Sequence, residues 1–210
     1  LFHCKHIERQ LSSSWRLAQA TKGLAPSAAL SASYGLRQRM LHFLYNLEYY
    51  MMFEVLEPNW HVLMLRLQAA SSVDAIISHH SHFLDASLKE CMLRDPTLLK
   101  LLAKLLTICV VFADQTRLVA VRVSEALDAA PIPATAGYER RERLAEASET
   151  VDAIITAARY ATNVRKLGSK FDAELHELIA ALRTQSRKEW NLAHLCARLD
   201  YNQFWSGGQQ

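Results

Sequence analysis

The sequence predicts an all-α fold, an antiparallel helical bundle of about seven mostly long helices. Apolar residues make up 50% of the 210 residues, and they recur at steps of three and four over long segments, as in amphipathic helices. Glycine and proline are scarce, with 6 and 5 residues, which favours long helices over a strand-rich fold. No segment alternates apolar and polar residues over a useful strand length, and no internal repeat is visible.

The first helix is expected over roughly residues 1–22. Its apolar residues follow a helical period at Phe2, Ile7, Leu11 and Trp15. Gly23 and Pro26 end this pattern, because neither residue continues a helix well. Since the pattern is already helical at the first residue, we interpret the chain as a fragment cut inside or near a helix of a larger protein.

The second helix, from about Tyr34 to Glu57, is apolar on most faces and is therefore expected to lie centrally. Pro58 cannot donate a backbone hydrogen bond, so a break or kink is expected there. Proline is tolerated in a first turn, so a third helix can begin at once and reach about Ala70. We interpret the aromatic residues of this region as core residues: Tyr45, Tyr49, Tyr50 and Trp60.

A fourth helix is expected to begin after a serine pair and to end near Leu93. Ser71 or Ser72 is a good N-cap, because a serine hydroxyl accepts a hydrogen bond from a free backbone N–H of the first turn. Asp74 lies early in this helix, where its negative charge is favourable to the helix dipole.

The pair Asp95-Pro96 is the clearest helix start in the chain. Aspartate caps the next helix and proline occupies its first position, which predicts a long fifth helix over roughly residues 96–127. The following segment, 129–137, contains two alternating prolines and is expected to form a surface loop.

The sixth helix is expected to be the longest, over residues 138–182. Its apolar period continues through Gly168, because one glycine costs only about 1 kcal/mol in a helix. A pair between Glu139 and Arg143 at four-residue spacing is expected to stabilise its first turns slightly. A last helix covers roughly residues 187–199, and an aromatic tail follows it.

Composition argues against several classes of partner. Acidic and basic residues are mixed, with a formal net charge of +3, whereas nucleic-acid binders usually gather Lys and Arg into a patch. The longest apolar run, 105–113, is shorter than the about 20 residues that span a bilayer. We therefore expect no nucleic acid and no membrane among the partners. The cysteines form no CxxC pair and are expected to be reduced, buried thiols: Cys4, Cys91, Cys109 and Cys196.

The sequence shows no arrangement typical of a catalytic or metal site. His79, His80 and His82 lie on one expected helix, but the residues four positions after His79 and His82 are Phe83 and Ala86, which are not metal ligands. His82 and Asp85 have suitable spacing, yet no third ligand is nearby. GxSxG and glycine-rich phosphate loops are absent. We therefore expect no metal, no cofactor and no enzyme activity.

Four separated blocks of this sequence resemble the γ-tubulin complex component family, whose yeast members are called spindle pole body components. The blocks are LFHCKHIERQL at 1–11, LRQRMLHFLYNLEYYMMFEVLEPNW at 36–60, HHSHFLDASLKECML at 79–93 and ARLDYNQFW at 197–205. Their order and spacing are similar to the family pattern over most of the chain, but residues 128–150 align poorly. The sequences FEVLEPNW and HHSHFLD are most similar to those of the second core component of the small complex.

The resemblance implies that residues 1–210 are part of one C-terminal helical γ-tubulin-binding domain. In this family the C-terminal domain holds γ-tubulin, N-terminal domains pack side by side, and the resulting array templates microtubule nucleation. The resemblance thus implies a scaffold without enzyme activity or cofactor. The implied partners are γ-tubulin and, through the absent N-terminal part, other complex components. The implied location is the cytoplasm and cytoskeleton, at a microtubule organising centre such as a centrosome or spindle pole.

From the matching blocks we nominate residues for γ-tubulin binding: Glu54, Glu57, Trp60, His79, His80, Asp85, Arg198, Asp200, Tyr201 and Asn202. Each nomination competes with a purely structural role, above all for Trp60 and Tyr201. The alternative function is a generic helical adaptor unrelated to tubulin, which predicts other partners and a regular repeat. A helical metalloenzyme, a third interpretation, predicts stoichiometric bound metal.

Overall fold

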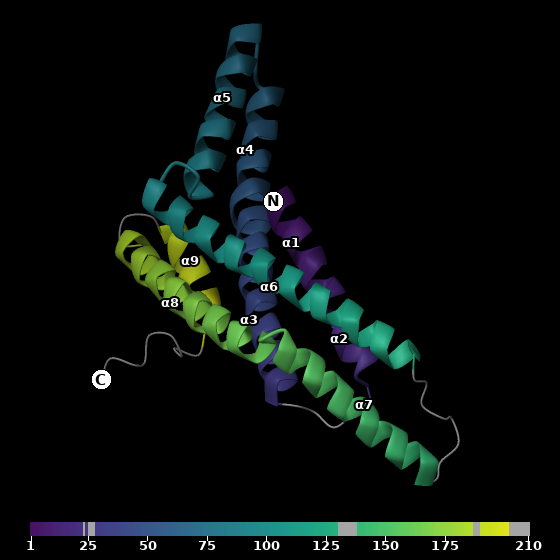
Figure 1. Ribbon diagram of the computed structural model, residues 1–210. Coiled ribbons are helices and arrows are strands. Elements are labelled where there is room, and N and C mark those ends of the chain that lie inside the picture. The colour runs from purple at the N-terminus through teal and green to yellow at the C-terminus, as the bar shows by residue number, and fades with distance from the viewer. Residues whose placement is uncertain (23, 25–27, 130–137, 187–189, 202–210) are drawn as a thin grey trace. The chain divides into compact units, whose positions relative to one another are not determined.

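The prediction of an all-α fold is confirmed. The computed structural model describes residues 1–22, 24, 28–129, 138–186 and 190–201, and these contain helices, turns and no strand (Figure 1). The helices are α1 Phe2–Ser13, α2 Trp15–Ala20, α3 Ala28–Tyr49, the π-helix η1 Tyr50–Leu56, α4 Glu57–Gln68, α5 Val73–Glu90, α6 Pro96–Ala129, α7 Tyr138–Ala157, α8 Tyr160–Ser186 and α9 Trp190–Leu199. The surface loop expected at 129–137 lies, from residue 130 onward, outside the described residues.

Two compact units divide the chain, and each is described by itself. The first unit contains residues 42–105 and 173–210, and the second contains residues 2–41 and 106–172. Helices α3, α6 and α8 each contribute residues to both units. The expectation that residues 1–210 form part of one domain therefore stays a prediction.

In the first unit, η1 and the antiparallel pair α4 and α5 are joined through the end of α5. The two helices of the pair lie side by side (Figure 1). The hydroxyl of buried Tyr50 donates to the backbone carbonyl of Glu90 at 2.9 Å, and Asn59 Nδ2 donates to Glu90 Oε2 at 2.8 Å. The fully buried side chains of this unit include Phe43, Leu44, Tyr50, Val55, Leu105, Leu178, Leu182 and Leu195. Their burial supplies the hydrophobic stabilisation that holds these helices together.

In the second unit, a buried tyrosine links three helices. Tyr160 Oη shares hydrogen bonds with Ser33 Oγ of α3 at 2.5 Å and with Thr116 Oγ1 of α6 at 2.9 Å. Burial raises the pKa of Tyr160 above its ordinary value, and the two hydroxyl partners oppose that rise. The surrounding core includes Ile7, Leu11, Leu17, Leu36, Met40, Phe112 and Phe171. The polar network is satisfied, so it specifies how these helices meet without leaving an orphaned group.

The expected irregularity before Pro58 takes the form of a π-helix. The backbone N–H of Glu57 donates to the carbonyl of Met52, a five-residue step, and α4 begins at once with Pro58 in its first turn. Proline lacks an N–H and its ring clashes with the carbonyl four residues earlier, so a wider turn accommodates it. The helix pattern therefore changes at Tyr50, upstream of the proline, and α3, η1 and α4 follow one another without a gap.

The two predicted caps are present. Ser72 Oγ accepts a hydrogen bond from Ala75 N at 3.2 Å at the start of α5. Asp95 Oδ1 accepts from Thr97 N at 2.8 Å and from Leu98 N at 2.9 Å at the start of α6. Asp95 Oδ2 also accepts from Gln185 Nε2 of α8 at 2.5 Å, so this cap joins two helices.

Two expected helices are each divided in the structure. The helix expected over 1–22 breaks at Ser14, where hydroxyls of consecutive serines donate to carbonyls three residues earlier and compete with the helical pattern. The helix expected over 138–182 continues through Gly168 but breaks between α7 and α8, where Arg159 adopts a φ of 50°. The prediction of an ion pair between Glu139 and Arg143 is wrong. Arg143 Nη1 instead pairs with Glu146 Oε2 at 3.0 Å.

Helix α6 is the most apolar of the long described helices. Among the described helices, α6 alone is long and apolar enough to cross a membrane, with a mean hydropathy of 1.9 over 18 residues. This is weak evidence for a span, because core helices pass the same test and 39% of that segment is buried.

All four cysteines are free and buried, as predicted, and burial raises the pKa of Cys109 to about 12.

Candidate functional site

The structure brings two nominated residues together between η1 and α9. The carboxylate of Glu54 accepts from Arg198 Nε at 3.0 Å and from His194 Nδ1 at 3.1 Å. The guanidinium of Arg198 also lies 3.7 Å from the ring centroid of Tyr49, and Tyr49 packs on Phe53 at 5.0 Å. We call these five residues the η1–α9 cluster. It combines a charge pair with exposed aromatic rings, which is the composition of many protein interfaces.

Most of the aromatic side chains expected in the core around η1 are exposed. Tyr49 is 41% exposed, whereas its neighbour Tyr50 is fully buried. Tyr45, Phe53 and Trp60 are also about half exposed. The prediction of a core role is therefore correct for Tyr50 and wrong for Tyr45, Tyr49 and Trp60. Large aromatic side chains left in water are energetically costly, which favours a partner at this face.

The sequence reasoning missed Tyr49, Phe53 and His194 as members of the cluster. A signal was available, because Tyr49 and Phe53, like His194 and Arg198, are separated by four residues and share a helix face. That signal was ambiguous, since the same spacing describes a core face. Only the placement of α9 against η1 shows that these side chains meet Glu54.

The nominated residues on α4 and α5 are more dispersed. Trp60 lies edge-on to Phe83 of α5, with ring centroids 6.0 Å apart, and His80 lies 6.5 Å from the same ring. Asp85 forms an exposed ion pair with Arg94. Glu57 is exposed and His79 is half-buried. These residues all lie on the α4–α5 pair.

The nominated residues at the C-terminal end differ sharply in exposure. Asp200 is buried, and its Oδ2 accepts from an Arg183 terminal nitrogen at 3.0 Å, so it holds the end of α9 against α8. Tyr201 is 89% exposed. Asn202 lies outside the described residues. Of this group, Arg198 and Tyr201 present accessible side chains, whereas a direct contact by Asp200 would require the end of α9 to move.

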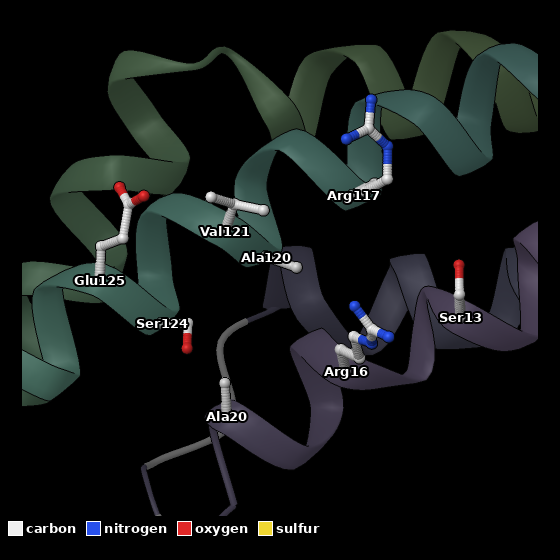
Figure 2. A pocket seen from close by; sticks show the side chains of 8 residues that line it. All are labelled: Ser13, Arg16, Ala20, Arg117, Ala120, Val121, Ser124 and Glu125. Atoms are coloured by element: carbon white, nitrogen blue, oxygen red, sulfur yellow. The ribbon is translucent and has the colours of Figure 1, made fainter.

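A pocket in the second unit contains no nominated residue. It has a volume of about 500 Å³ and lies between α2 and the C-terminal half of α6 (Figure 2). Its lining residues are Ser13, Arg16, Ala20, Arg117, Ala120, Val121, Ser124 and Glu125. In Figure 2 the guanidinium group of Arg16 lies between α2 and α6, whereas that of Arg117 points away from α2, so the two cations do not converge in the pocket.

Within the described residues, no group of three or more His, Cys, Asp or Glu side chains could hold a metal ion. The nearest approach to a ligand pair in the η1–α9 cluster is His194 with Glu54, and Arg198 already occupies the other carboxylate oxygen. The chemistry that this arrangement supports is polar and aromatic recognition of another surface.

Comparison with known proteins gives a consistent set of relatives. The family described as "Gamma tubulin complex component C-terminal" matches residues 1–205. The chain is 36% identical to mouse gamma-tubulin complex component 2 over 225 aligned residues, covering 98% of this chain and 25% of that protein. It is 45% identical to the Arabidopsis thaliana gamma-tubulin complex component 2 over 118 residues, covering 56% of this chain and 17% of that protein.

A yeast protein extends the comparison. The chain is 40% identical over 121 residues to the spindle pole body component alp4 of Schizosaccharomyces pombe, covering 53% of this chain and 15% of that protein. The chain thus spans about a quarter or less of the length of these relatives. The similarity to second components agrees with the resemblance carried by residues 36–60 and 79–93.

Proposed function

This chain belongs to the γ-tubulin complex component family, and from that premise we propose that it binds γ-tubulin as a helical scaffold without chemistry of its own. The observation that supports this proposal most strongly is the family match over residues 1–205. The names of the relatives assign them to the γ-tubulin complex or the spindle pole body. The proposal transfers this association to the 210-residue chain.

The docking face in this proposal is the η1–α9 cluster. Phe53 and Tyr49 provide apolar area that is costly to leave in water, and Arg198 provides a planar group that can stack and donate hydrogen bonds. Glu54 orients Arg198 through its Nε and leaves the terminal guanidinium nitrogens for a partner. Because Glu54 and Tyr49 already hold this side chain, less conformational entropy is lost on binding.

Within an assembly of several such chains, this face would contribute to microtubule nucleation only by orienting the bound γ-tubulin. A scaffold that holds γ-tubulins at fixed positions removes part of the translational and rotational entropy cost of aligning the first tubulins of a microtubule. We accordingly place the chain in the cytoskeleton, at microtubule organising centres, with other complex components as further partners. Any nucleotide in this scheme is bound by γ-tubulin.

The proposal is tested by measuring binding of purified γ-tubulin to the immobilised chain. Phe53→Glu replaces an apolar side chain that is 55% exposed, and it should weaken binding at least tenfold. Leu118→Glu is the matched control, because Leu118 is 56% exposed but lies on α6 in the second unit. Circular dichroism establishes that both variants keep their helical content.

Three outcomes are informative. Loss of binding by Phe53→Glu with retention by Leu118→Glu supports this face. Equal affinities of both variants and the parent chain remove the η1–α9 cluster from the interface. Absence of any γ-tubulin binding by the folded parent chain contradicts the function itself and favours the generic helical adaptor.

A further inference from the structure

Arg198 keeps one edge of its guanidinium group available, while the rest of the group is held by this chain. Its Nε donates to Glu54 Oε1 at 3.0 Å, and its Cζ lies 3.7 Å from the ring centroid of Tyr49. Within the described residues, the terminal nitrogens Nη1 and Nη2 donate no hydrogen bond. The Arg198 side chain is 38% exposed, so an acceptor from outside the chain can reach this edge.

Glu54, in contrast, has both carboxylate oxygens engaged within the chain. Oε1 accepts from Arg198, and Oε2 lies 3.1 Å from His194 Nδ1. The side chain of Glu54 is only 18% exposed. A partner that contacted this carboxylate directly would have to displace one of the two bonds. Glu54 therefore reaches a partner through Arg198, which makes it a positioning residue.

The geometry of the free edge of Arg198 identifies the acceptor. Nη1 and Nη2 donate along two nearly parallel directions, and the two oxygens of a carboxylate match them with two hydrogen bonds. A single backbone carbonyl would leave one of the nitrogens unpaired. Glu54 lies on the Nε side, so the two carboxylates would occupy different edges of the planar group. The Tyr49 ring covers one face of the guanidinium, and exclusion of water there strengthens an ionic contact at its edge.

We propose that Arg198 binds an Asp or Glu carboxylate of γ-tubulin through Nη1 and Nη2, and that Glu54 only positions Arg198. This inference rests on the proposed function, because it identifies the chemical group that the same site recognises. Tyr49 is 41% exposed, and Phe53, which packs on Tyr49, is 55% exposed. These rings would exclude water from the ion pair once the two surfaces meet, as in the hot spots of many interfaces.

Binding of purified γ-tubulin to immobilised variants tests the two-bond contact. Arg198→Gln should weaken binding about tenfold or more. Arg198→Lys should lose most of the same affinity, because lysine keeps the charge but lacks the planar pair of donors. Arg117→Lys is the matched control and should bind as the parent does: Arg117 is 60% exposed, pairs with Asp114 through its Nε at 3.9 Å, and lies on α6 in the second unit. Parent-like affinity of Arg198→Lys overturns the two-bond contact.

Ionic strength and a scan of the partner test the carboxylate. The affinity of the parent chain should fall as salt is raised, and that of Arg198→Gln should fall by a smaller factor, because one ion pair across the interface has been removed. Among single Asp→Asn and Glu→Gln variants of γ-tubulin, one should weaken binding to the parent chain but not to Arg198→Gln. Equal salt factors, or a scan without such a position, would show a neutral acceptor and overturn the proposal.

A double-mutant cycle within this chain tests the role of Glu54. Glu54→Ala alone should weaken binding by roughly threefold to tenfold, because Arg198 loses the bond that orients it. In an Arg198→Ala chain, Glu54→Ala should cause no further loss. A further loss would show that Glu54 contacts the partner itself, against its assignment as a positioning residue. Circular dichroism establishes that each variant keeps its helical content.

The same measurements separate this inference from the proposed function. If the folded parent chain binds γ-tubulin and Arg198→Gln binds equally well, the carboxylate contact is wrong and the function stands. If the folded parent chain does not bind γ-tubulin, the proposed function itself is contradicted.

Discussion

Two residues with positive φ end helices in this protein, and their substitution by glycine should change stability in opposite directions. Met92 has a φ of 64° after α5, and Arg159 has a φ of 50° after α7. At the first site Leu93 N donates to Leu88 O and Met92 N donates to Lys89 O, both at 3.0 Å. This is the hydrogen-bond pattern in which glycine is preferred at the left-handed position.

The magnitude follows from what each side chain contacts. The left-handed conformation costs a residue with a Cβ about 1–2 kcal/mol in the folded protein, and glycine removes that cost. Glycine also has more conformational entropy in the unfolded chain, which lowers the free energy of unfolding by about 0.5–1 kcal/mol. Arg159 is exposed, so Arg159→Gly should raise the free energy of unfolding by about 0.5–1 kcal/mol. Met92 is 2% exposed, and removal of a buried methionine costs about 2–5 kcal/mol, so Met92→Gly should be strongly destabilising.

Urea unfolding followed by far-ultraviolet circular dichroism measures both changes. Arg159→Ala is the control for loss of the arginine side chain, because it keeps the unfavourable φ and should change stability by less than about 0.5 kcal/mol. Destabilisation by Arg159→Gly that exceeds that of Arg159→Ala would refute the reasoning. A neutral Met92→Gly would show that the buried side chain contributes little.

Three further changes test the fold. Asp95→Ala should cost about 1 kcal/mol, because Asp95 caps α6, whereas Asp95→Asn should retain most of the cap in thermal unfolding experiments. The hydrogen bond from Leu98 N, followed by those from Gln185 and Thr97, lowers the pKa of Asp95, so its contribution is complete above the unfolded pKa and is lost as pH falls through the lower folded pKa. Thermal scans between about pH 6 and 2 should show this loss in the parent and less of it in Asp95→Asn. Gly168→Ala should raise the free energy of unfolding by about 0.5–1 kcal/mol in urea titrations, because alanine favours the helix more than glycine does. The added Cβ would meet Arg39 Nη2 at 3.5 Å, an ordinary contact distance, so a decrease in stability would show that α8 needs the space. Tyr160→Phe should cost about 1–3 kcal/mol in the same titration, because buried Ser33 and Thr116 lose a hydroxyl partner, and an unchanged midpoint would contradict that role.

Much of the fold was predictable because its signals are local. Asp95-Pro96 specified the start of α6, and Ser72 with Asp74 specified the start of α5, since capping involves groups only two or three residues apart. The break at Arg159 was not predictable, because an arginine in a left-handed conformation has no sequence signature and the apolar period continues through it. The change to a π-helix at Tyr50 was expected only as an irregularity near Pro58.

The candidate site was predictable only in part. The matching blocks nominated Glu54 and Arg198, which the structure brings into contact, but the residues that complete the cluster were identified only from the packing of α9 on η1. Asp200, which shares a block with Arg198, is instead buried in an ion pair with Arg183. All ten nominations for γ-tubulin binding, Glu54 and Arg198 included, stay predictions.

The amino-acid sequence by itself determined the helical class of this protein, the caps that begin α5 and α6, and its family. These depend on periodicity, on hydrogen bonds between near neighbours, and on the residue order of separated blocks. Only the tertiary structure decided which apolar side chains are buried. Tyr49 and Tyr50 are adjacent and chemically identical, yet the first stacks under Arg198 in solvent and the second is fully enclosed. The reason is that burial depends on which helix covers which face, and a helix with apolar residues on most sides does not encode that choice locally.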